Sequence, residues 1–323
     1  MNIERYKSIF LTHLEGKSIE KEPVNLYAPI NYILNLGGKR LRPILALLST
    51  DAFGDDPKKA LDVALAIEVF HNFTLIHDDI MDDAPLRRGK ETVHEKWDIN
   101  TGILSGDAML ILAYQILESY EPKIYKELMR VFNQTALEVC EGQQMDMDFE
   151  TRTDVTLSEY MKMITLKTSV LVAAALQMGG IIAGASEDDK QRIYDFGLNL
   201  GLAFQLQDDY LDAFGNPETF GKQVGGDIIE NKKTYLVLKA LENATSEQSE
   251  NLLNLYTEEN QDQETKIEAV KNLFEETGAV KMIQDEIENY TQKAFEYLEQ
   301  MQIDTEKKQI LIDFGNFLMK RNV

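Results

Sequence analysis

Apolar residues recur every three or four positions along most of the chain, which is the spacing of one face of an α-helix. After Gly278 this face consists of Ile283, Ile287, Tyr290, Ala294 and Tyr297. Mostly Glu, Gln, Asp and Lys lie between them, so we predict a surface helix with one buried stripe. Residues 61–76, 166–185 and 196–211 are apolar nearly all round. This pattern predicts helices at the centre of a bundle.

Breaks in the helical pattern are short. They occur at residues 23–29, 37–38, 54–57, 85–89, 215–226 and 245–250. None is long enough to be a flexible linker between domains. We find neither a convincing strand alternation nor a short repeat. The pattern therefore predicts an all-α protein, with residues 1–323 forming a single large helical bundle of ten or more helices.

Composition narrows the class of protein. The chain has 33 basic and 55 acidic residues, a net charge of −22, which is the opposite of a nucleic-acid-binding surface. Cys140 is the only cysteine, which excludes an intrachain disulfide and a four-cysteine zinc site. The start lacks a secretion signal, and no apolar run reaches the roughly 20 residues of a membrane helix. We expect a soluble, cytoplasmic protein without stable membrane insertion.

Three aspartates follow directly on an apolar helix. If the helix continues, Asp78 and Asp82 lie one turn apart on one face, and Asp79 lies on the adjoining edge. Carboxylates this close repel each other unless a divalent cation lies between them, and Mg²⁺ commonly bridges one or two carboxylates to a substrate phosphate. A solvated acidic patch is the alternative, as at residues 55–56 and 188–189. The apolar helix before Asp78 favours the metal site.

A second cluster repeats this spacing. Asp208, Asp209 and Asp212 lie 130 residues later, again after an apolar helix. Two such clusters at the ends of buried helices could face each other across a bundle cavity. They would then hold several metal ions around one diphosphate.

Basic residues accompany both clusters, several of them beside glycines: Lys39, Arg42, Arg87, Arg88, Lys222 and Lys232. The planar guanidinium of Arg donates two parallel hydrogen bonds to phosphate oxygens. Lys39 and Arg42 are three residues apart and could grip one phosphate together. Ordinary surface charges are the alternative, but the acidity of the chain favours phosphate binding.

Two further polar positions lie in apolar helices. His71 precedes Asp78 by seven residues, so the two share roughly one face; a core histidine is the alternative. Lys167 and Thr168 interrupt another apolar helix. An unpaired buried Lys is costly, so we expect Lys167 to reach into a polar cavity.

Together these segments resemble the trans-type isoprenyl diphosphate synthases, or polyprenyl synthetases, over essentially the whole chain. The matching segments, in the family's order, are GGKRLRP, EVFHNFTLIHDDIMDDAPLRRG, LSGDAML, the Lys-Thr pair, FQLQDDYLD and GKQVGGDIIENKKT. One DDxxD motif is weak, since terpene cyclases also carry it, whereas two with basic companions are highly specific. The resemblance implies the isoprenoid synthase fold, with helices around a central substrate cavity, and a homodimer.

The resemblance also implies the reaction, in which an allylic diphosphate (dimethylallyl, geranyl or farnesyl) condenses head-to-tail with isopentenyl diphosphate with the help of three Mg²⁺ ions. The implied metal ligands are Asp78, Asp79 and Asp82 on one side and Asp208 opposite, with Asp209 and Asp212 in support. The implied contacts of the allylic diphosphate are Arg87, Lys167, Thr168, Gln205, Lys222 and Lys232. Those of isopentenyl diphosphate are Lys39, Arg42, His71 and Arg88. One extra residue between Lys222 and Lys232, relative to some members, makes the role of Lys222 less secure.

Three other functions stay open. The His77-Asp78 pair would suit a His-Asp metal phosphohydrolase, but that chemistry needs further histidines and only His13, His71 and His94 remain. A terpene cyclase should carry a different second motif from DDYLD. A non-catalytic partner subunit would be expected to have lost an aspartate or a basic contact.

Product length and assembly are the finer expectations. Phe73 and Thr74 lie about one turn deeper on the helix that ends at Asp78. Thr74 is small enough to let a growing chain pass, and Phe73 can form a floor, a combination most like that of geranylgeranyl (C20) synthases. Farnesyl and longer products are the alternatives, as is a core role for Phe73. The apolar residues 104–117 could form a dimer interface or an internal core helix.

Overall fold

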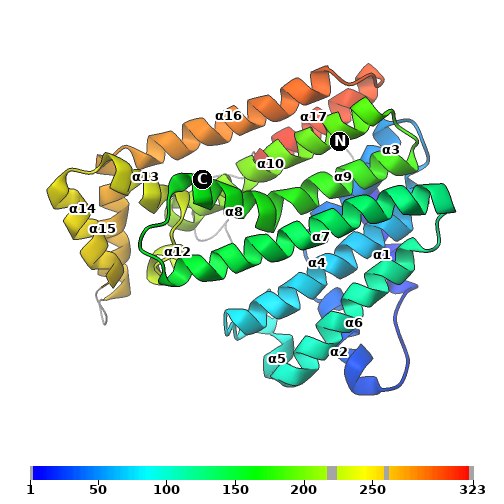
Figure 1. The fold of residues 1–323 in the computed structure, drawn as a ribbon, viewed down its shortest axis with the longest axis horizontal. Helices are drawn as coiled ribbons and strands as arrows, with labels where there is room; N and C mark the ends of the chain where they lie inside the picture. Colours follow the sequence, from blue (N-terminus) through cyan, green and yellow to red (C-terminus); the bar gives the residue numbers. More distant parts are fainter. Residues whose placement is uncertain (1–2, 217–223, 258–261, 320–323) are drawn as a thin grey trace. The chain divides into compact units, whose positions relative to one another are not determined.

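The computed structural model describes residues 3–216, 224–257 and 262–319, which are almost entirely helical (Figure 1). Within these ranges the strands are β1 (Leu86–Arg87) and β2 (Lys90–Glu91), which form one short antiparallel hairpin. The predicted all-α class and the expectation of ten or more helices are confirmed.

The chain divides into two compact units. The first contains residues 1–134, 174–194 and 301–311, and the second contains residues 135–173, 195–300 and 312–323. The division falls within the helices α7 (Pro122–Thr151), α9 (Val170–Ile182), α10 (Glu187–Phe214) and α17 (Thr305–Met319). A single domain over residues 1–323 stays a prediction.

The first unit is built around α4 (Leu61–Met81), which packs against α2, α3 and α6. The other helices of this unit are α1 (Ile3–Glu15), α2 (Val24–Asn35), α3 (Leu41–Ala52), η1 (Pro57–Ala60), α5 (Val93–Lys96) and α6 (Ile99–Leu117). Residues 63–70 of α4 are all buried, so the prediction of a central helix from the apolar run 61–76 is confirmed. Each buried Leu, Ile or Phe side chain contributes about 1.5–3 kcal/mol.

Polar contacts fix α3 against α9 within the first unit. The hydroxyls of Ser49 and Thr50 donate to the carbonyls of Leu176 and Gly179, over 2.6 and 3.0 Å. A side chain at Gly179 would meet the carbonyl oxygen of Ala46 at 2.3 Å. The two helices therefore approach closely because α9 carries a glycine at this point.

Two predicted breaks were wrong. Most of the predicted break at residues 245–250 is helical, since α14 (Ser246–Thr257) begins at Ser246. α2 begins directly after Pro23 and continues through Pro29, which is buried. An interior proline removes one helical hydrogen bond and costs roughly 3 kcal/mol. Burial of Ile30, Ile33 and Leu34 on the same helix offsets that cost.

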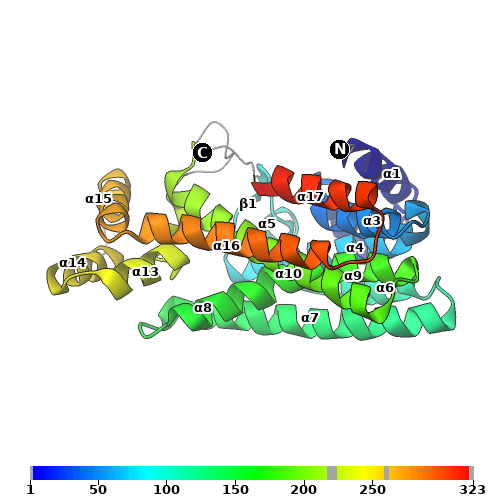
Figure 2. The same ribbon diagram turned by 90° about the horizontal axis from the view of Figure 1, so that it is seen from above.

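The second unit gathers its own core around α15 and α16. Its elements are α8 (Leu157–Ile164), the π-helical turn η2 (Thr165–Ser169), α12 (Gly226–Ile229), α13 (Tyr235–Asn243), α14 (Ser246–Thr257), α15 (Gln263–Glu276) and α16 (Ala279–Glu299). Figure 2 shows α13, α14 and α15 grouped beside α16. The predicted stripe of α16 is confirmed at Ile283 and Ala294, whereas Leu298 is buried in place of Tyr297.

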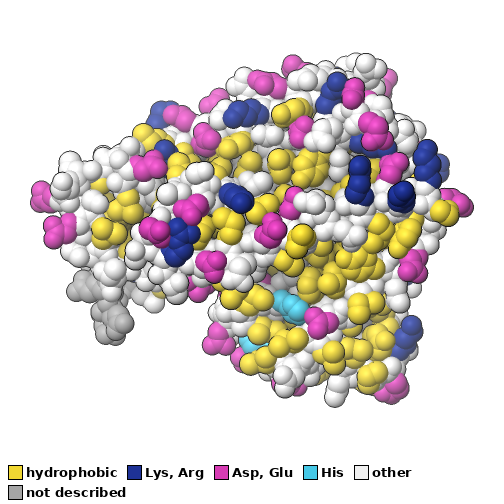
Figure 3. All heavy atoms as spheres, viewed as in Figure 1, with side chains coloured by type: hydrophobic (Ala, Val, Ile, Leu, Met, Phe, Trp, Pro, Cys, Tyr) yellow, Lys and Arg dark blue, Asp and Glu magenta, His cyan; other side chains and the backbone are white. Residues whose placement is uncertain are grey.

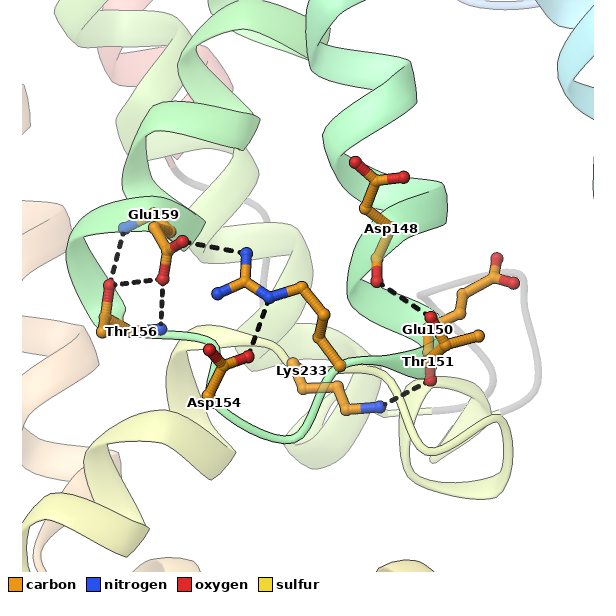
Figure 4. A network of polar contacts seen from close by, with 8 residues as sticks. Asp148, Glu150, Thr151, Asp154, Thr156, Glu159 and Lys233 are labelled. Carbon is orange, nitrogen blue, oxygen red and sulfur yellow. Dashed lines mark hydrogen bonds and ion pairs between the residues drawn. The ribbon is translucent and has the colours of Figure 1, made fainter.

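A network of hydrogen bonds and ion pairs stabilises the connection between α7 and α8 (Figure 4). Thr156 and Glu159 form a capping box at the start of α8, a motif that satisfies two backbone donors at a helix start. Arg152 bridges Asp154 and Glu159 over 2.8 and 2.9 Å. Lys233 donates from Nζ to the carbonyl of Glu150 over 2.9 Å, which ties the segment that carries Lys232 to the end of α7.

Two stretches meet the length and hydropathy of a membrane span, contrary to the expectation from sequence. They are Pro57–Met81 and Leu157–Ile182, with mean hydropathies of 1.2 and 1.4. In each, 67% of the most apolar window is buried within the protein, as in a core helix of a soluble protein.

Candidate active site

The first aspartate motif lies at the carboxyl end of α4. Asp78 and Asp79 belong to the last turn, and Asp82 caps the helix, where its N–H donates to the carbonyl of Asp78 over 2.9 Å. The predicted one-turn separation of Asp78 and Asp82 is therefore confirmed. Asp82 is exposed, whereas Asp79 is only 1% exposed.

Arg87 neutralises part of this charge. Its Nε lies 2.8 Å from both carboxylate oxygens of Asp79, its Nη2 lies 2.6 Å from Asp79 Oδ1, and the same Nη2 lies 3.8 Å from Asp78 Oδ2. Burial raises the pKa of Asp79; Arg87 opposes this shift and the charge of Asp78 adds to it. Arg87 is thus beside the first motif, as predicted, and here it binds a carboxylate.

A cationic cluster, formed by Lys39, Arg42 and Arg88 around His71, lies at the glycine turn of residues 37–40 and the first turn of α3. Arg42 Nη1 lies 3.2 Å from His71 Nε2, and Arg88 donates to the carbonyl of Gly37. Burial, followed by the charges of Arg42, Arg88, Arg87 and Arg40, holds the pKa of His71 well below 6.5. His71 is therefore neutral near pH 7 and accepts from Arg42 through Nε2.

The residues predicted to bind the second substrate are thus in one place. Lys39 lies in the same turn and is exposed to solvent. Gly38 has a φ of 117° and lies so close to Arg88 that a Cβ would meet its Cζ at 2.8 Å. The glycines therefore let the backbone turn and let the guanidinium pack upon it. Several cationic groups around a neutral histidine form a site for an anion such as a diphosphate.

The second aspartate motif lies in the last two turns of α10, in the second unit. Asp209 is 5% exposed; the hydroxyl of Tyr160 donates to it, and so does Gln205 Nε2 over 3.2 Å. Burial, then the charges of Asp227 and Asp208, raise the pKa of Asp209 well above 3.8, against the effect of these hydrogen bonds. Gln205, predicted to contact a substrate, here positions Asp209.

Asp212 accepts hydrogen bonds from the backbone of residues 225–227, which follow the second motif in the chain. Its carbonyl accepts from the N–H of Gly225 over 2.6 Å, and its Oδ2 accepts from the N–H of Asp227 over 3.0 Å. Gly225 has a φ of 85°, which favours glycine. Residues 225–227 therefore lie against the motif, and a fourth carboxylate, that of Asp227, joins the cluster.

Lys167 and Thr168 lie on the π-helical turn η2. Lys167 Nζ lies 2.5 Å from Asp146 Oδ2, and Thr168 donates to Gln205 Oε1 over 3.2 Å. Lys167 thus has an acidic partner, whereas the polar cavity expected around it stays a prediction. A π-turn within a helix is rare and is frequent at functional sites.

Two glycines seat this π-turn. A Cβ at Gly142 of α7 would meet the backbone nitrogen of Lys167 at 2.3 Å, and one at Gly201 of α10 would meet the Cα of Ser169 at 2.9 Å. Any larger residue would push the turn away. Close packing on both sides therefore sets the direction of the Lys167 side chain.

Lys232 lies near the same carboxylates. Its Nζ is 2.9 Å from Glu230 Oε2. Burial opposes the charge of Lys232, but the hydrogen bond with Glu230 and the charge of Asp227 outweigh it and raise its pKa. Lys222, the other lysine predicted here, lies outside the described residues.

The sequence did not indicate three members of this site. Tyr160 and Asp146 contact predicted residues from other helices, and Asp227 belongs to a segment noted only for its glycines and lysines. The one available signal was Lys167, because a lysine in an apolar helix requires an acidic partner. Its partner could not be named without the fold.

The donor atoms fit magnesium. Among the described residues, His, Cys, Asp and Glu side chains do not gather in groups of three or more that could hold a metal ion by themselves. Asp78, Asp79 and Asp208 offer only carboxylate oxygens, and Mg²⁺ is usually bound through one or two carboxylates together with waters and substrate phosphates. Each motif by itself therefore suits an ion that arrives with a diphosphate.

Comparison with known proteins agrees with this chemistry. Residues 23–274 match the family model described as polyprenyl synthetase. A short chain isoprenyl diphosphate synthase of Methanothermobacter thermautotrophicus is 39% identical over 93% of this chain and 91% of its own. A geranylfarnesyl diphosphate synthase of Natronomonas pharaonis is 36% identical over 94% and 92%.

The fold of this chain is also similar to that of a solved structure. A crystal structure of a geranylgeranyl pyrophosphate synthase is 56% identical, covers 100% of both chains and superposes with a TM-score of 0.96. The matched family region includes both aspartate motifs and the basic residues around them. This chain therefore belongs to the polyprenyl synthetase family and is a trans-prenyltransferase.

Proposed function

We propose that this protein condenses an allylic diphosphate with isopentenyl diphosphate in a Mg²⁺-dependent reaction, with geranylgeranyl diphosphate as its main product. The allylic C–O bond breaks and its electron pair leaves with the diphosphate. The alkene of isopentenyl diphosphate then forms the new C–C bond, and loss of one proton restores a double bond. The released diphosphate is the base that takes this proton.

One observation carries this proposal. The hairpin β1–β2 presents two adjacent arginines to two different partners: Arg87 contacts Asp79 of the first motif, and Arg88 contacts the glycine turn beside His71. A carboxylate cluster and a cationic cluster thus adjoin along α4. The first suits a diphosphate that carries metal ions, and the second suits one bound directly by cations.

The aspartates and the basic residues would have different chemical roles. When bound, Mg²⁺ would stabilise the negative charge that grows on the leaving diphosphate. Three ions would be held by Asp78, Asp79 and Asp82 of the first motif and by Asp208 of the second, with Asp209 and Asp212 in support. Lys167, Thr168, Gln205, Lys232 and Arg87 would bind the same diphosphate, together with Lys222, which lies outside the described residues. Donors fixed in place before the reaction stabilise such charge without reorganising.

The second substrate would lie in the cationic cluster. Lys39, Arg42, His71 and Arg88 would hold the diphosphate of isopentenyl diphosphate, with the neutral His71 directing Arg42. Apolar residues along α4 would keep water from the allylic cation, so that the alkene is the nucleophile that reaches it.

The product would be limited by Phe73. This residue is 8% exposed and lies five positions before Asp78, whereas Thr74 is half-buried and donates to the carbonyl of His71 over 2.8 Å. A chain that passes the small Thr74 would meet the ring of Phe73. A geranylgeranyl (C20) product follows from this order, with farnesyl or longer products as alternatives.

We further propose a cytoplasmic homodimer formed through α6. One side of α6 is buried, at Met109, Ala113 and Leu117. The other side exposes large apolar side chains: Ile99, Ile103, Leu104 and Ile111. Figure 3 shows hydrophobic side chains gathered over this helix. A second copy of the chain is the partner we propose for this exposed side.

The test is product analysis. Purified protein with Mg²⁺, isopentenyl diphosphate and dimethylallyl, geranyl or farnesyl diphosphate should yield C20 prenyl diphosphate by chromatography. Diphosphate should appear only when both substrates are present, and activity should disappear in a chelator and return with Mg²⁺. Diphosphate released from an allylic substrate alone would instead indicate a cyclase or a phosphohydrolase.

A further inference from the structure

Arg40 stands between two residues of the cationic cluster but points away from them. It is the last residue of the turn at residues 37–40 and directly precedes α3, with a φ of 52°. Its side chain is 2% exposed; Nη1 donates to Glu68 Oε1 and Nη2 donates to the carbonyl of Leu34. With both terminal nitrogens engaged inside the protein, Arg40 cannot bind a substrate.

Glu68 is equally enclosed. Its side chain is 3% exposed and lies on α4, one turn before His71. Asn72 Nδ2 donates to Glu68 Oε1 over 3.1 Å and to the Glu68 carbonyl over 2.7 Å. Glu68 therefore receives hydrogen bonds from both the turn and its own helix.

The stability of the folded protein does not explain why Arg40 and Glu68 form a buried ion pair. Removing two charges from water costs about as much as their attraction returns, and a well-packed apolar pair of similar size is often as stable or more so. Arg40 also adopts a left-handed backbone conformation, which costs about 1–2 kcal/mol in a residue other than glycine. An arrangement this costly is explained if the geometry of the turn matters for function.

The turn and the start of α3 contact α4 at two points one helical turn apart. Arg40 contacts Glu68, and Arg42 contacts His71. Gly37 and Gly38 also have positive φ values, 83° and 117°, so the backbone before Arg40 has little other support from regular structure. The contact with Glu68 therefore fixes the turn that carries Lys39 and leads into α3, where Arg42 lies in the first turn.

We propose that Arg40 and Glu68 are positioning residues, a buried pair that orients the turn at residues 37–40 and the first turn of α3 for the diphosphate of isopentenyl diphosphate. This inference rests on the proposed function for the identity of that ligand. Loss of the pair raises the KM for isopentenyl diphosphate and leaves the KM for the allylic substrate and the kcat at saturation close to wild type.

The test compares Arg40→Met, Glu68→Gln and the double variant Arg40→Met/Glu68→Met. Arg40→Met leaves a buried carboxylate without its guanidinium and can fail to fold, whereas the double variant removes both charges and keeps similar volume. We expect the double variant to melt within a few degrees of wild type. Its KM for isopentenyl diphosphate should nevertheless rise at least roughly tenfold, since small displacements of a binding group have large effects.

Lys190→Met is the matched control, because Lys190 is another largely buried cation of the first unit and pairs with Glu127 over 2.7 Å. This variant should lose thermal stability without a change in either KM. A folded double variant with a wild-type KM for isopentenyl diphosphate, or with both KM values raised equally, would overturn the inference.

Direct binding separates this inference from the proposed function. Calorimetric titration with isopentenyl diphosphate should show binding to wild type and at least roughly tenfold weaker binding to the double variant. Wild type that fails to bind this compound would overturn the ligand assignment and the proposed function with it. Equal binding by wild type and the double variant would refute only the role of the Arg40–Glu68 pair.

Discussion

The ring of Phe73 packs against the imidazole of His77, edge to face, with 4.8 Å between the ring centroids. On its other side Phe73 lies 5.5 Å from the ring of Phe70, which in turn lies 5.2 Å from Phe132. Gly106 makes room for His77, since a Cβ there would meet its Nε2 at 2.4 Å. Aromatic neighbours therefore hold Phe73 at a defined depth below Asp78.

Phe73→Ala should shift the products beyond C20. Truncation removes the ring that we propose as the floor, although Phe70 and Phe132 remain behind it, so we expect chains longer by one or two isoprene units. The variant should also lose about 3–5 kcal/mol of stability through the cavity. Chromatography of the products with farnesyl diphosphate as starter measures the shift.

Phe10→Ala carries the same truncation in α1, where Phe10 is fully buried. Its products should keep the wild-type length. An unchanged distribution in Phe73→Ala would mean that the floor lies on another residue.

Asp78→Ala and Asp208→Ala should each reduce condensation at least about a hundredfold, because each removes a carboxylate that we propose as a metal ligand. Neither change should alter the helical content, since both side chains lie near the ends of helices and their loss relieves repulsion between carboxylates. Steady-state assays and far-ultraviolet circular dichroism give the two measurements.

Asp188→Ala is the control for these variants, because Asp188 is an exposed acidic residue in the first turn of α10. It should retain wild-type activity. If both Asp78→Ala and Asp208→Ala retained more than about a tenth of the activity, the two-motif mechanism would be wrong.

Acid should destabilise the protein through His71. Its pKa in the folded protein is well below 6.5, because of burial and then the charges of Arg42, Arg88, Arg87 and Arg40. The unfolded chain therefore binds this proton first, and the contribution of neutral His71 is complete above pH 6.5 and decreases as the pH falls below it. The slope from this one group is at most about 1.4 kcal/mol per pH unit.

His71→Gln keeps a neutral acceptor for Arg42 and removes the titration. Denaturant unfolding at several pH values between about 7.5 and 5 should show a shallower loss of stability in this variant than in wild type. Parallel curves for the two proteins would show that His71 does not contribute.

Leu104→Glu with Ile111→Glu should convert the proposed dimer to a monomer. These side chains are 60% and 59% exposed on α6, and a buried interface would not accept two unpaired carboxylates. Sedimentation at micromolar concentration distinguishes the states. Leu253→Glu, at a 48% exposed position on α14, should leave the assembly unchanged. A wild type that is already monomeric would refute the dimer.

The helices, and which site residues share a helix face, could be predicted from the spacing of residues along the chain. Helical periodicity is a local property. It is enough to predict the i, i+4 relation of Asp78 and Asp82, the register of His71 with Asp78 and the buried stripe of α16. The same local rules failed at Pro29, where burial of neighbouring apolar residues outweighed the loss of one hydrogen bond.

Partners from distant segments could not be predicted in this way. Nothing near Lys167 in the chain indicates Asp146, nothing near Asp209 indicates Tyr160, and Arg40 looks like any other member of a basic turn. Desolvation and Coulomb attraction act through space, so the shifted pKa values of His71 and Asp209 exist only once helices have packed around them. The sequence determines which chemical groups are present. The packing of the helices determines which of these groups can bind a substrate and which, like Arg40 and Glu68, position the others.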